Sequence, residues 1–172
     1  MRRWVTVTMA TALLVGAGTS AQAADDGWTP VPVQPFERAA GVVCDFAVKG
    51  DPIVADIKKR TLTRYPDGTV RSELWTGPLV YRVTNESTGA QTTLDGSSSA
   101  IITYNKDGSS KWYLSGPLGV AIPEGKSNLP RGLWQVDGPA YTLTLSATGF
   151  ETLNKGPRTT TENICSRLDP LR

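Results

Sequence analysis

The chain has no histidine, only two cysteines, and no long hydrophobic run after its first 17 residues. Histidine is the commonest general base and metal ligand, so its absence excludes the usual serine–histidine and cysteine–histidine catalytic arrangements. Zinc sites lose their usual nitrogen ligand, and the sequence contains no Asp-x-Asp-x-Asp-Gly calcium loop. We therefore expect no metal, no cofactor and no catalytic motif, and the sequence favours a protein that is not an enzyme.

The N-terminus has the pattern of a secretory signal peptide. Arg2 and Arg3 precede an uncharged apolar stretch over residues 5–17, and Ala21-Gln22-Ala23 supplies a small-x-small cleavage site. The apolar stretch is shorter than the roughly 20 residues needed to cross a bilayer. The sequence therefore predicts a signal peptide at residues 1–23, secretion from the cell, and no membrane association in the mature form.

Removal of that leader leaves a chain whose charges balance. Of the 18 basic and 16 acidic residues, Arg2 and Arg3 belong to the leader. A near-neutral chain is not attracted as a whole to phosphate backbones. The one basic cluster, Lys58-Lys59-Arg60 with Arg64, has no interleaved aromatic residues, which argues against a nucleic-acid partner.

The remaining residues, roughly 150, fit one domain with its own core. Residues 24–40 are rich in proline and are expected to form a flexible N-terminal arm. Residues 41–172 contain short runs of alternating apolar and polar residues, most clearly over 141–146. Such alternation is typical of antiparallel strands with one buried face, so the sequence predicts an all-β domain.

Turn motifs support short, sequential connections. Asp67-Gly68 and Asp107-Gly108 are suited to tight hairpins, and Gly77-Pro78-Leu79 recurs as Gly116-Pro117-Leu118. Sequential hairpins favour an up-and-down meander that closes as a small β-barrel, with a β-sandwich as the alternative.

The two cysteines, Cys44 and Cys165, are expected to form a disulfide, because an exported protein meets an oxidising environment. The bond requires the beginning and the end of the domain to lie side by side. Pairing of the first and last strands of a barrel would satisfy this requirement.

Three segments resemble an exported β-domain family of high-GC Gram-positive bacteria for which no activity is known. They are residues 41–48 (Gly-Val-Val-Cys-Asp-Phe-Ala-Val), residues 83–89, and Gly156-Pro157-Arg158 ahead of Ile164-Cys165. The resemblance implies a small secreted β-barrel or related β fold, without catalytic residues. The likeness to lipocalin-like or allene-oxide-cyclase-like barrels is one of architecture alone.

Aromatic residues provide the candidates for a binding site. Four of them are expected on the apolar faces of strands, where they either fill the core or line a cavity: Tyr81, Trp112, Trp134 and Tyr141. Trp75 and Tyr113 are expected on the outer face, where they could contact protein or carbohydrate. The leading hypothesis is a non-catalytic secreted protein that holds a small amphiphilic molecule in the barrel interior.

Two alternatives remain open. Residues 122–133 form a long connection that could offer Lys126 or Arg131 to an extracellular protein, as an interaction or inhibitor module does. A carboxylate-dependent enzyme or isomerase would need paired acids such as Glu73 with Asp95 or Glu151. Alternation places Glu73 and Glu151 on outer faces, which argues against this last hypothesis.

Overall fold

The computed structural model describes residues 27–169, which are built almost entirely from antiparallel β-strands. The helical element in this range is a single 3-10 turn, η1 (Ile164–Arg167). The predicted signal peptide, residues 1–23, lies outside the described residues. The all-β class expected from alternation is confirmed.

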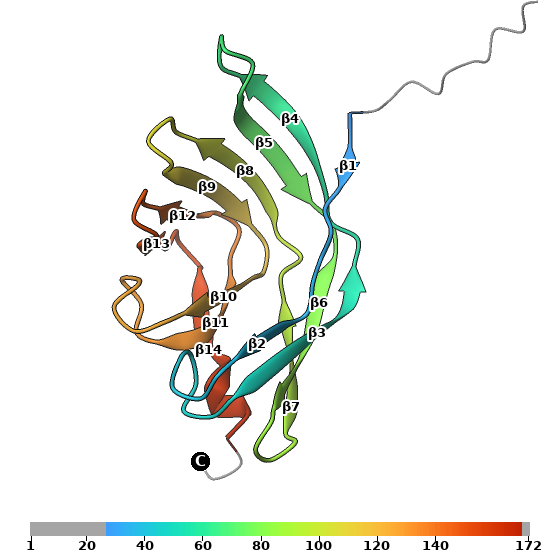
Figure 1. The fold of residues 1–172 in the computed structure, drawn as a ribbon, viewed down its shortest axis with the longest axis vertical. Coiled ribbons are helices and arrows are strands. Elements are labelled where there is room, and N and C mark those ends of the chain that lie inside the picture. The colour runs from blue at the N-terminus through green and yellow to red at the C-terminus, as the bar shows by residue number, and fades with distance from the viewer. Residues whose placement is uncertain (1–26, 170–172) are drawn as a thin grey trace, which may run out of the picture.

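A seven-stranded sheet forms the upper part of Figure 1, with the order β1-β4-β5-β8-β9-β12-β13. Its strands are β1 (Thr29–Pro30), β4 (Lys58–Arg64), β5 (Val70–Thr76), β8 (Ser99–Tyr104), β9 (Ser110–Ser115), β12 (Tyr141–Leu145) and β13 (Glu151–Asn154). Every neighbouring pair is antiparallel.

Two smaller sheets lie below it (Figure 1). The four-stranded sheet has the order β2-β3-β6-β7, with β2 (Phe36–Arg38), β3 (Val48–Ala55), β6 (Leu79–Asn85) and β7 (Gln91–Asp95). The three-stranded sheet has the order β10-β11-β14, with β10 (Leu118–Ile122), β11 (Gly132–Asp137) and β14 (Thr160–Asn163).

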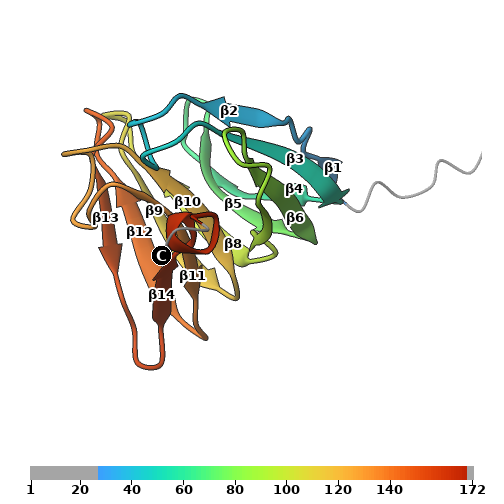
Figure 2. The same cartoon turned by 90° about the horizontal axis from the view of Figure 1, so that it is seen from below.

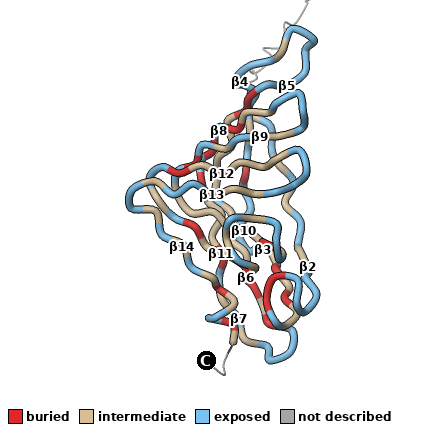
Figure 3. Tube along the Cα trace, turned by 90° about the vertical axis from the view of Figure 1, so that its left-hand side faces the viewer, coloured by how far each residue is buried: buried red, intermediate tan, exposed pale blue. Residues whose placement is uncertain are grey.

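The three sheets are produced by bends in one meander of long strands. A few residues separate β3 from β4, β5 from β6, β7 from β8, β9 from β10, β11 from β12 and β13 from β14. Each of these pairs therefore places one strand in the seven-stranded sheet and one in a smaller sheet. The hairpin loops at the far ends of the strands are exposed, whereas buried positions lie along the strands (Figure 3).

Gly-Pro dipeptides stand at most of these bends. They are Gly77-Pro78, Gly116-Pro117, Gly138-Pro139 and Gly156-Pro157. Gly77 adopts a φ of +132°, and a Cβ atom at this position would overlap the carbonyl oxygen of Asp56. Proline has no amide hydrogen to donate, so strand pairing is interrupted at the same place. The Gly-Pro-Leu repeat seen in the sequence thus marks two of the bends.

No sheet within residues 27–169 closes on itself, so the closed barrel is not confirmed. β8 pairs with β9 above the bends, but β7 and β10 are not hydrogen-bonded below them. Gln135 of β11 bridges this gap, because its side chain accepts from the Asp95 amide (2.8 Å) and donates to the Asp95 carbonyl (2.8 Å). The two small sheets share one buried cluster of apolar side chains.

The predicted disulfide between Cys44 and Cys165 is present, with 5.6 Å between the two Cα atoms. Cys44 lies in the bend before β3 rather than in the strand itself. η1 lies at the lower end, between the two small sheets (Figure 2). Around the disulfide lies one buried cluster that joins both sheets to η1: Val43, Cys44, Val48, Val83, Leu94, Leu133, Ile164 and Leu168.

The central strand of the three-stranded sheet, β11, has buried side chains on both of its faces. Leu133 of β11 belongs to the cluster around the disulfide, whereas Val136 of the same strand belongs to a second cluster. That second cluster covers the inner face of the seven-stranded sheet: Ala100, Ile102, Leu114, Val136, Tyr141, Leu143 and Leu153. One small sheet thus fills the space beneath the larger one.

The segment expected as a flexible arm pairs with the seven-stranded sheet and with the four-stranded sheet. β1 pairs with the edge of β4, β2 pairs with the edge of β3, and the Tyr81 hydroxyl donates to the Gln34 carbonyl between them (3.0 Å). Unpaired sheet edges expose backbone groups that favour aggregation, so the arm protects two edges.

We predict that Gly77→Ala lowers the free energy of unfolding by about 2–4 kcal/mol. The new Cβ would meet the Asp56 backbone in a conformation that L-residues rarely adopt. Gly68→Ala is the matched control: its φ is also positive, at +83°, but a Cβ there meets nothing within 4 Å. It should cost about 1 kcal/mol in urea denaturation. Equal losses for the two variants would contradict a special constraint at the bend.

Candidate functional site

Two adjoining cavities lie between the arm and the sheets. The first, about 340 Å³, is lined by residues of β2, β6, β7, β10 and β11. The second, about 330 Å³, lies between residues 31–34 and strands β5, β6, β8, β9 and β10. They share Leu79, Tyr81, Gly96, Leu118 and Gly119, so the two cavities adjoin. Each has the volume of a small-molecule site, for which about 300–1,000 Å³ is usual.

Aromatic rings form much of the cavity wall. Trp75 and Trp112 line the second cavity, Phe36 lines the first, and Tyr81 lines both. Phe36 and Tyr81 meet edge to face with 5.2 Å between ring centres. The indole nitrogen of Trp112 donates to Ser110 (3.1 Å). Because the polar atom of this ring is satisfied within the protein, its apolar surface is left to face the cavity.

Polar groups stand at defined places in this wall. Arg38 lines the first cavity, with its guanidinium carbon 5.6 Å from the centre of the Phe36 ring. Gln34 and Ser98 line the second cavity. A largely apolar space with a few polar groups suits a ligand that is itself amphiphilic.

The four aromatic residues proposed from the sequence separate into two groups. Tyr81 and Trp112 line the cavity. The Trp134 nitrogen donates to the Pro130 carbonyl (3.0 Å), so this residue braces the start of β11. Tyr141 is 4% exposed in the core, and its hydroxyl donates to the Gly116 carbonyl (2.8 Å) at a bend. Burial, together with the charge of Asp137, raises the pKa of Tyr141.

The arm supplies cavity residues that strand patterns alone did not indicate. Residues 31–34 and Phe36 line the interior, and Leu79 and Leu118, the residues that follow two of the Gly-Pro bends, do the same. A signal was present in the sequence, because Val31 and Val33 alternate with Pro30, Pro32 and Gln34. The density of prolines in this segment hid that alternation.

The long connection between β10 and β11 is held in place by hydrogen bonds and an ion pair to other parts of the protein. Arg131 donates to the Gly41 carbonyl (2.8 Å) and forms an ion pair with Asp45 beside the disulfide. The Asn128 side chain exchanges two hydrogen bonds of 2.8 Å with the Leu153 backbone. The connection therefore covers the outer edge of β13, and of the two proposed contact residues Lys126 is the exposed one.

Glu73 was expected on an outer face, and this prediction is wrong. Its side chain lies on the inner face and is 5% exposed. Its carboxylate accepts hydrogen bonds from Trp75 (2.9 Å) and Tyr104 (2.9 Å), and Lys59 lies 3.1 Å away. Burial by itself would raise the pKa of Glu73, but these three donors outweigh it and lower the pKa. Trp75 was also expected on the outer face, but it lies on the inner face with Glu73 and lines the second cavity.

The sequence prediction chose the wrong buried face of β5, because the strand contains two alternating sets of residues and either set could be the buried one. Ser72 and Leu74 form one set, and Glu73 and Trp75 form the other. The larger apolar surface of Trp75 is partly buried on the inner face, and Glu73 is tolerated there because its charge is paired and hydrogen-bonded. Leu74 lies on the outer face.

Glu151 also belongs to the inner face rather than the outer one. It pairs in register with Leu145, and one of its carboxylate oxygens is buried without a hydrogen-bond partner among the described residues. Burial raises the pKa of Glu151. The pKa of Glu73 is lowered because donors surround its carboxylate, whereas the pKa of Glu151 is raised because a buried oxygen of its carboxylate has no donor among the described residues.

These acids do not form the paired carboxylates that a glycosidase uses. Strands β8, β9 and β12 lie between the strands that carry Glu73 and Glu151, which is four interstrand spacings of about 4.8 Å. Paired catalytic carboxylates lie within about 10 Å of each other. Asp95 accepts from the backbone amide of Ser97 (2.9 Å) instead of approaching Glu73.

Comparison with known proteins returned no matching family model, no similar curated protein and no similar solved structure. Within residues 27–169, no group of three or more metal-ligating side chains lies together. The same range contains no helix with the length and apolar character needed to cross a membrane.

We predict that Glu73→Gln lowers the free energy of unfolding at neutral pH by about 2–4 kcal/mol, since an amide cannot accept from all three donors. The lowered pKa of Glu73 means that its stabilisation is present above the pKa of unfolded glutamate. It is lost as the pH falls through the folded value, so the deficit of the variant should shrink in acid.

Glu151→Gln is the control for this prediction. Its raised pKa means that the ionised form is disfavoured in the folded state, so any stabilisation disappears as the pH rises through the folded value. The variant should be as stable as the parent, or more stable, at neutral pH. Denaturant titrations across pH that showed equal losses for both variants would contradict the assigned networks.

Proposed function

We propose that this protein is a non-catalytic binding protein that holds a small amphiphilic molecule in its interior. The observation that supports the proposal is the pair of aromatic-lined cavities that share Tyr81 and four further residues. The three sheets and the disulfide would enclose the ligand as the wall of a barrel does, although the hydrogen bonding is divided between sheets.

The apolar part of such a ligand would lie between Leu79, Leu118 and the rings of Tyr81 and Trp112. Its polar end would lie near Arg38 in the first cavity or near Gln34 and Ser98 in the second. Burial of the apolar part supplies most of the affinity, and the polar contacts fix the orientation.

We further propose that the mature protein acts outside the cell, in keeping with the predicted leader and the disulfide. The alternative of an interaction module based on residues 122–133 receives less support. Arg131, its proposed anchor, is held by Gly41 and Asp45.

Binding can be tested with the fluorescent amphiphile anilinonaphthalene sulfonate and with dodecanoate as competitor. We expect saturable fluorescence, displacement by dodecanoate, and quenching of tryptophan emission through Trp75 and Trp112. Ala121→Phe places a ring in the first cavity and should weaken binding at least about tenfold.

The matched control is Ala55→Phe, which adds the same ring at an exposed position of β3. It should leave the affinity within about twofold of the parent. If dodecanoate displaces nothing, or if both phenylalanine variants bind the probe like the parent, the interior is not the binding site.

A further inference from the structure

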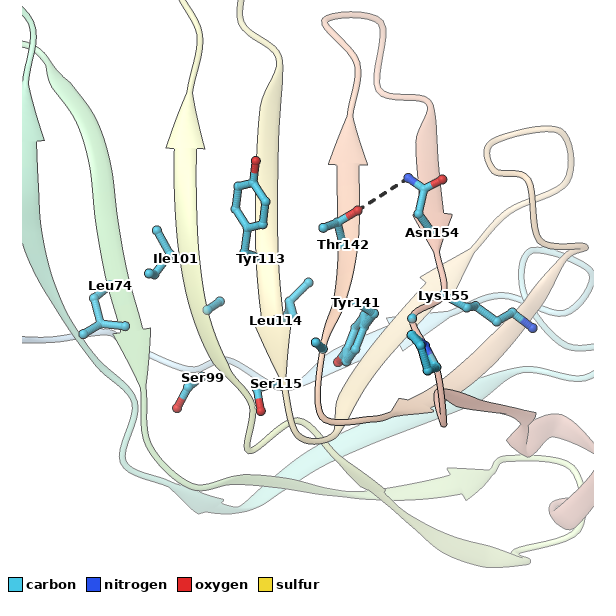
Figure 4. Close-up of a pocket in the computed structure, with 14 residues that line it drawn as sticks. Leu74, Ser99, Ile101, Tyr113, Leu114, Ser115, Tyr141, Thr142, Asn154 and Lys155 are labelled. Carbon is cyan, nitrogen blue, oxygen red and sulfur yellow. Dashed lines mark hydrogen bonds between the residues drawn. The ribbon is translucent and has the colours of Figure 1, made fainter.

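The outer face of the seven-stranded sheet carries a row of side chains that crosses the sheet from β4 to β13. The strand registers align one residue per strand: Arg60, Leu74, Ile101, Tyr113, Thr142 and Asn154. The last five lie side by side across the strands in Figure 4, where Asn154 also bonds Thr142. They line a groove of about 650 Å³ on the side opposite the interior.

The middle of this row is apolar and open to solvent. Ile101 is 45% exposed and Tyr113 is 50% exposed, although both occupy central strands of the sheet. At the β4 end of the row, the Trp28 ring lies 5.0 Å from the guanidinium of Arg60 and 5.3 Å from the ammonium of Lys58. An exposed stripe of this kind on a sheet face is a candidate contact surface.

Rows of hydroxyl groups run along both sides of this stripe. One row contains Thr63, Ser72, Thr103, Lys111, Thr144 and Thr152, and the other contains Thr76, Ser99 and Ser115. Thr63 bonds Ser72 (2.6 Å), and Thr76 bonds Ser99 (2.8 Å). The other hydroxyls in these rows have no side-chain partner among the described residues, so they are available to an external molecule.

The charge on this face is of one sign. Lys58, Arg60 and Lys111 lie on it, whereas the carboxylates within the strands of this sheet, Glu73 and Glu151, lie on the inner face. The small net charge of the chain, +2, conceals this local asymmetry. A positive face without competing carboxylates attracts a polyanion.

We propose that this face binds an acidic polysaccharide, independently of the ligand in the interior. The row from Leu74 to Tyr113 would contact the apolar faces of sugar rings, and the threonine and serine hydroxyls would bond sugar hydroxyls. Lys58, Arg60 and Lys111 would pair with the carboxylates of the polymer. From β4 to β13 the row spans five interstrand spacings, about 24 Å, which suits an extended chain of several sugars.

A single-stranded nucleic acid fits this surface less well, because it is bound by successive aromatic side chains that stack its bases. Tyr113 is the one aromatic residue between Arg60 and Asn154 in the row. A lipid surface also fits less well, because a protein face that binds a bilayer must bury a continuous apolar surface, and the rows of hydroxyl groups interrupt this one.

Affinity electrophoresis in gels that contain polygalacturonate tests the proposal, with dextran as the neutral polymer and double-stranded DNA as the other polyanion. We expect polygalacturonate to retard the protein strongly, and dextran and DNA to retard it weakly or not at all. Added salt should reduce the retardation.

Two variants locate the surface, and each has a matched control. Tyr113→Ala and Lys111→Glu should each weaken the binding of polygalacturonate at least about fivefold. Phe150→Ala removes an exposed aromatic residue elsewhere, and Lys126→Glu makes the same change in net charge on the loop of residues 122–133. Both controls should stay within about twofold of the parent.

Three results would overturn the proposal: no retardation by polygalacturonate, equal retardation by DNA with no effect of Tyr113→Ala, or equal weakening by Lys111→Glu and Lys126→Glu. All of these variants alter exposed side chains, so loss of the fold does not obscure the outcome. The interior ligand is tested with different probes, and either proposal can fail without the other.

Discussion

The close approach of backbones at the strand bends determines how the three sheets form. Gly77 lies against the carbonyl of Asp56, and Gly156 lies against the carbonyl of Ala140, so closely that neither position has room for a side chain. The proline after each glycine interrupts the hydrogen-bonded ladder at the same place. One meander is thereby divided into a large sheet and two smaller ones.

This division creates both the core and the cavities. The three-stranded sheet turns back beneath the seven-stranded sheet, and its central strand β11 contributes to a buried cluster on each face. β7 and β10 separate, and residues of both strands line the first cavity. The disulfide and Gln135 hold the lower half together where no ladder does. The arm and the connection between β10 and β11 cover edges that would otherwise remain unpaired.

Local chemistry in the sequence predicted the hairpins at Gly68 and Gly108, which adopt positive φ as expected, and the pairing of Cys44 with Cys165. It did not predict where the strands bend, because Gly-Pro is compatible with a turn as well as a bend. The face of β5 was ambiguous, since the burial of Glu73 depends on Lys59 and Tyr104 from neighbouring strands. The position of Arg131 likewise depends on distant partners, Gly41 and Asp45, that no single segment specifies.

The most direct test of an enclosed binding space is native mass spectrometry of protein collected from the medium of cells that export it, without refolding. We expect the exported parent protein to carry a small molecule that dissociates when the disulfide-bonded chain is denatured. The exported Ala121→Phe variant should carry no such molecule. A parent protein whose mass is always that of the bare chain, together with a crystal structure in which side chains fill the interior, would contradict the proposed function.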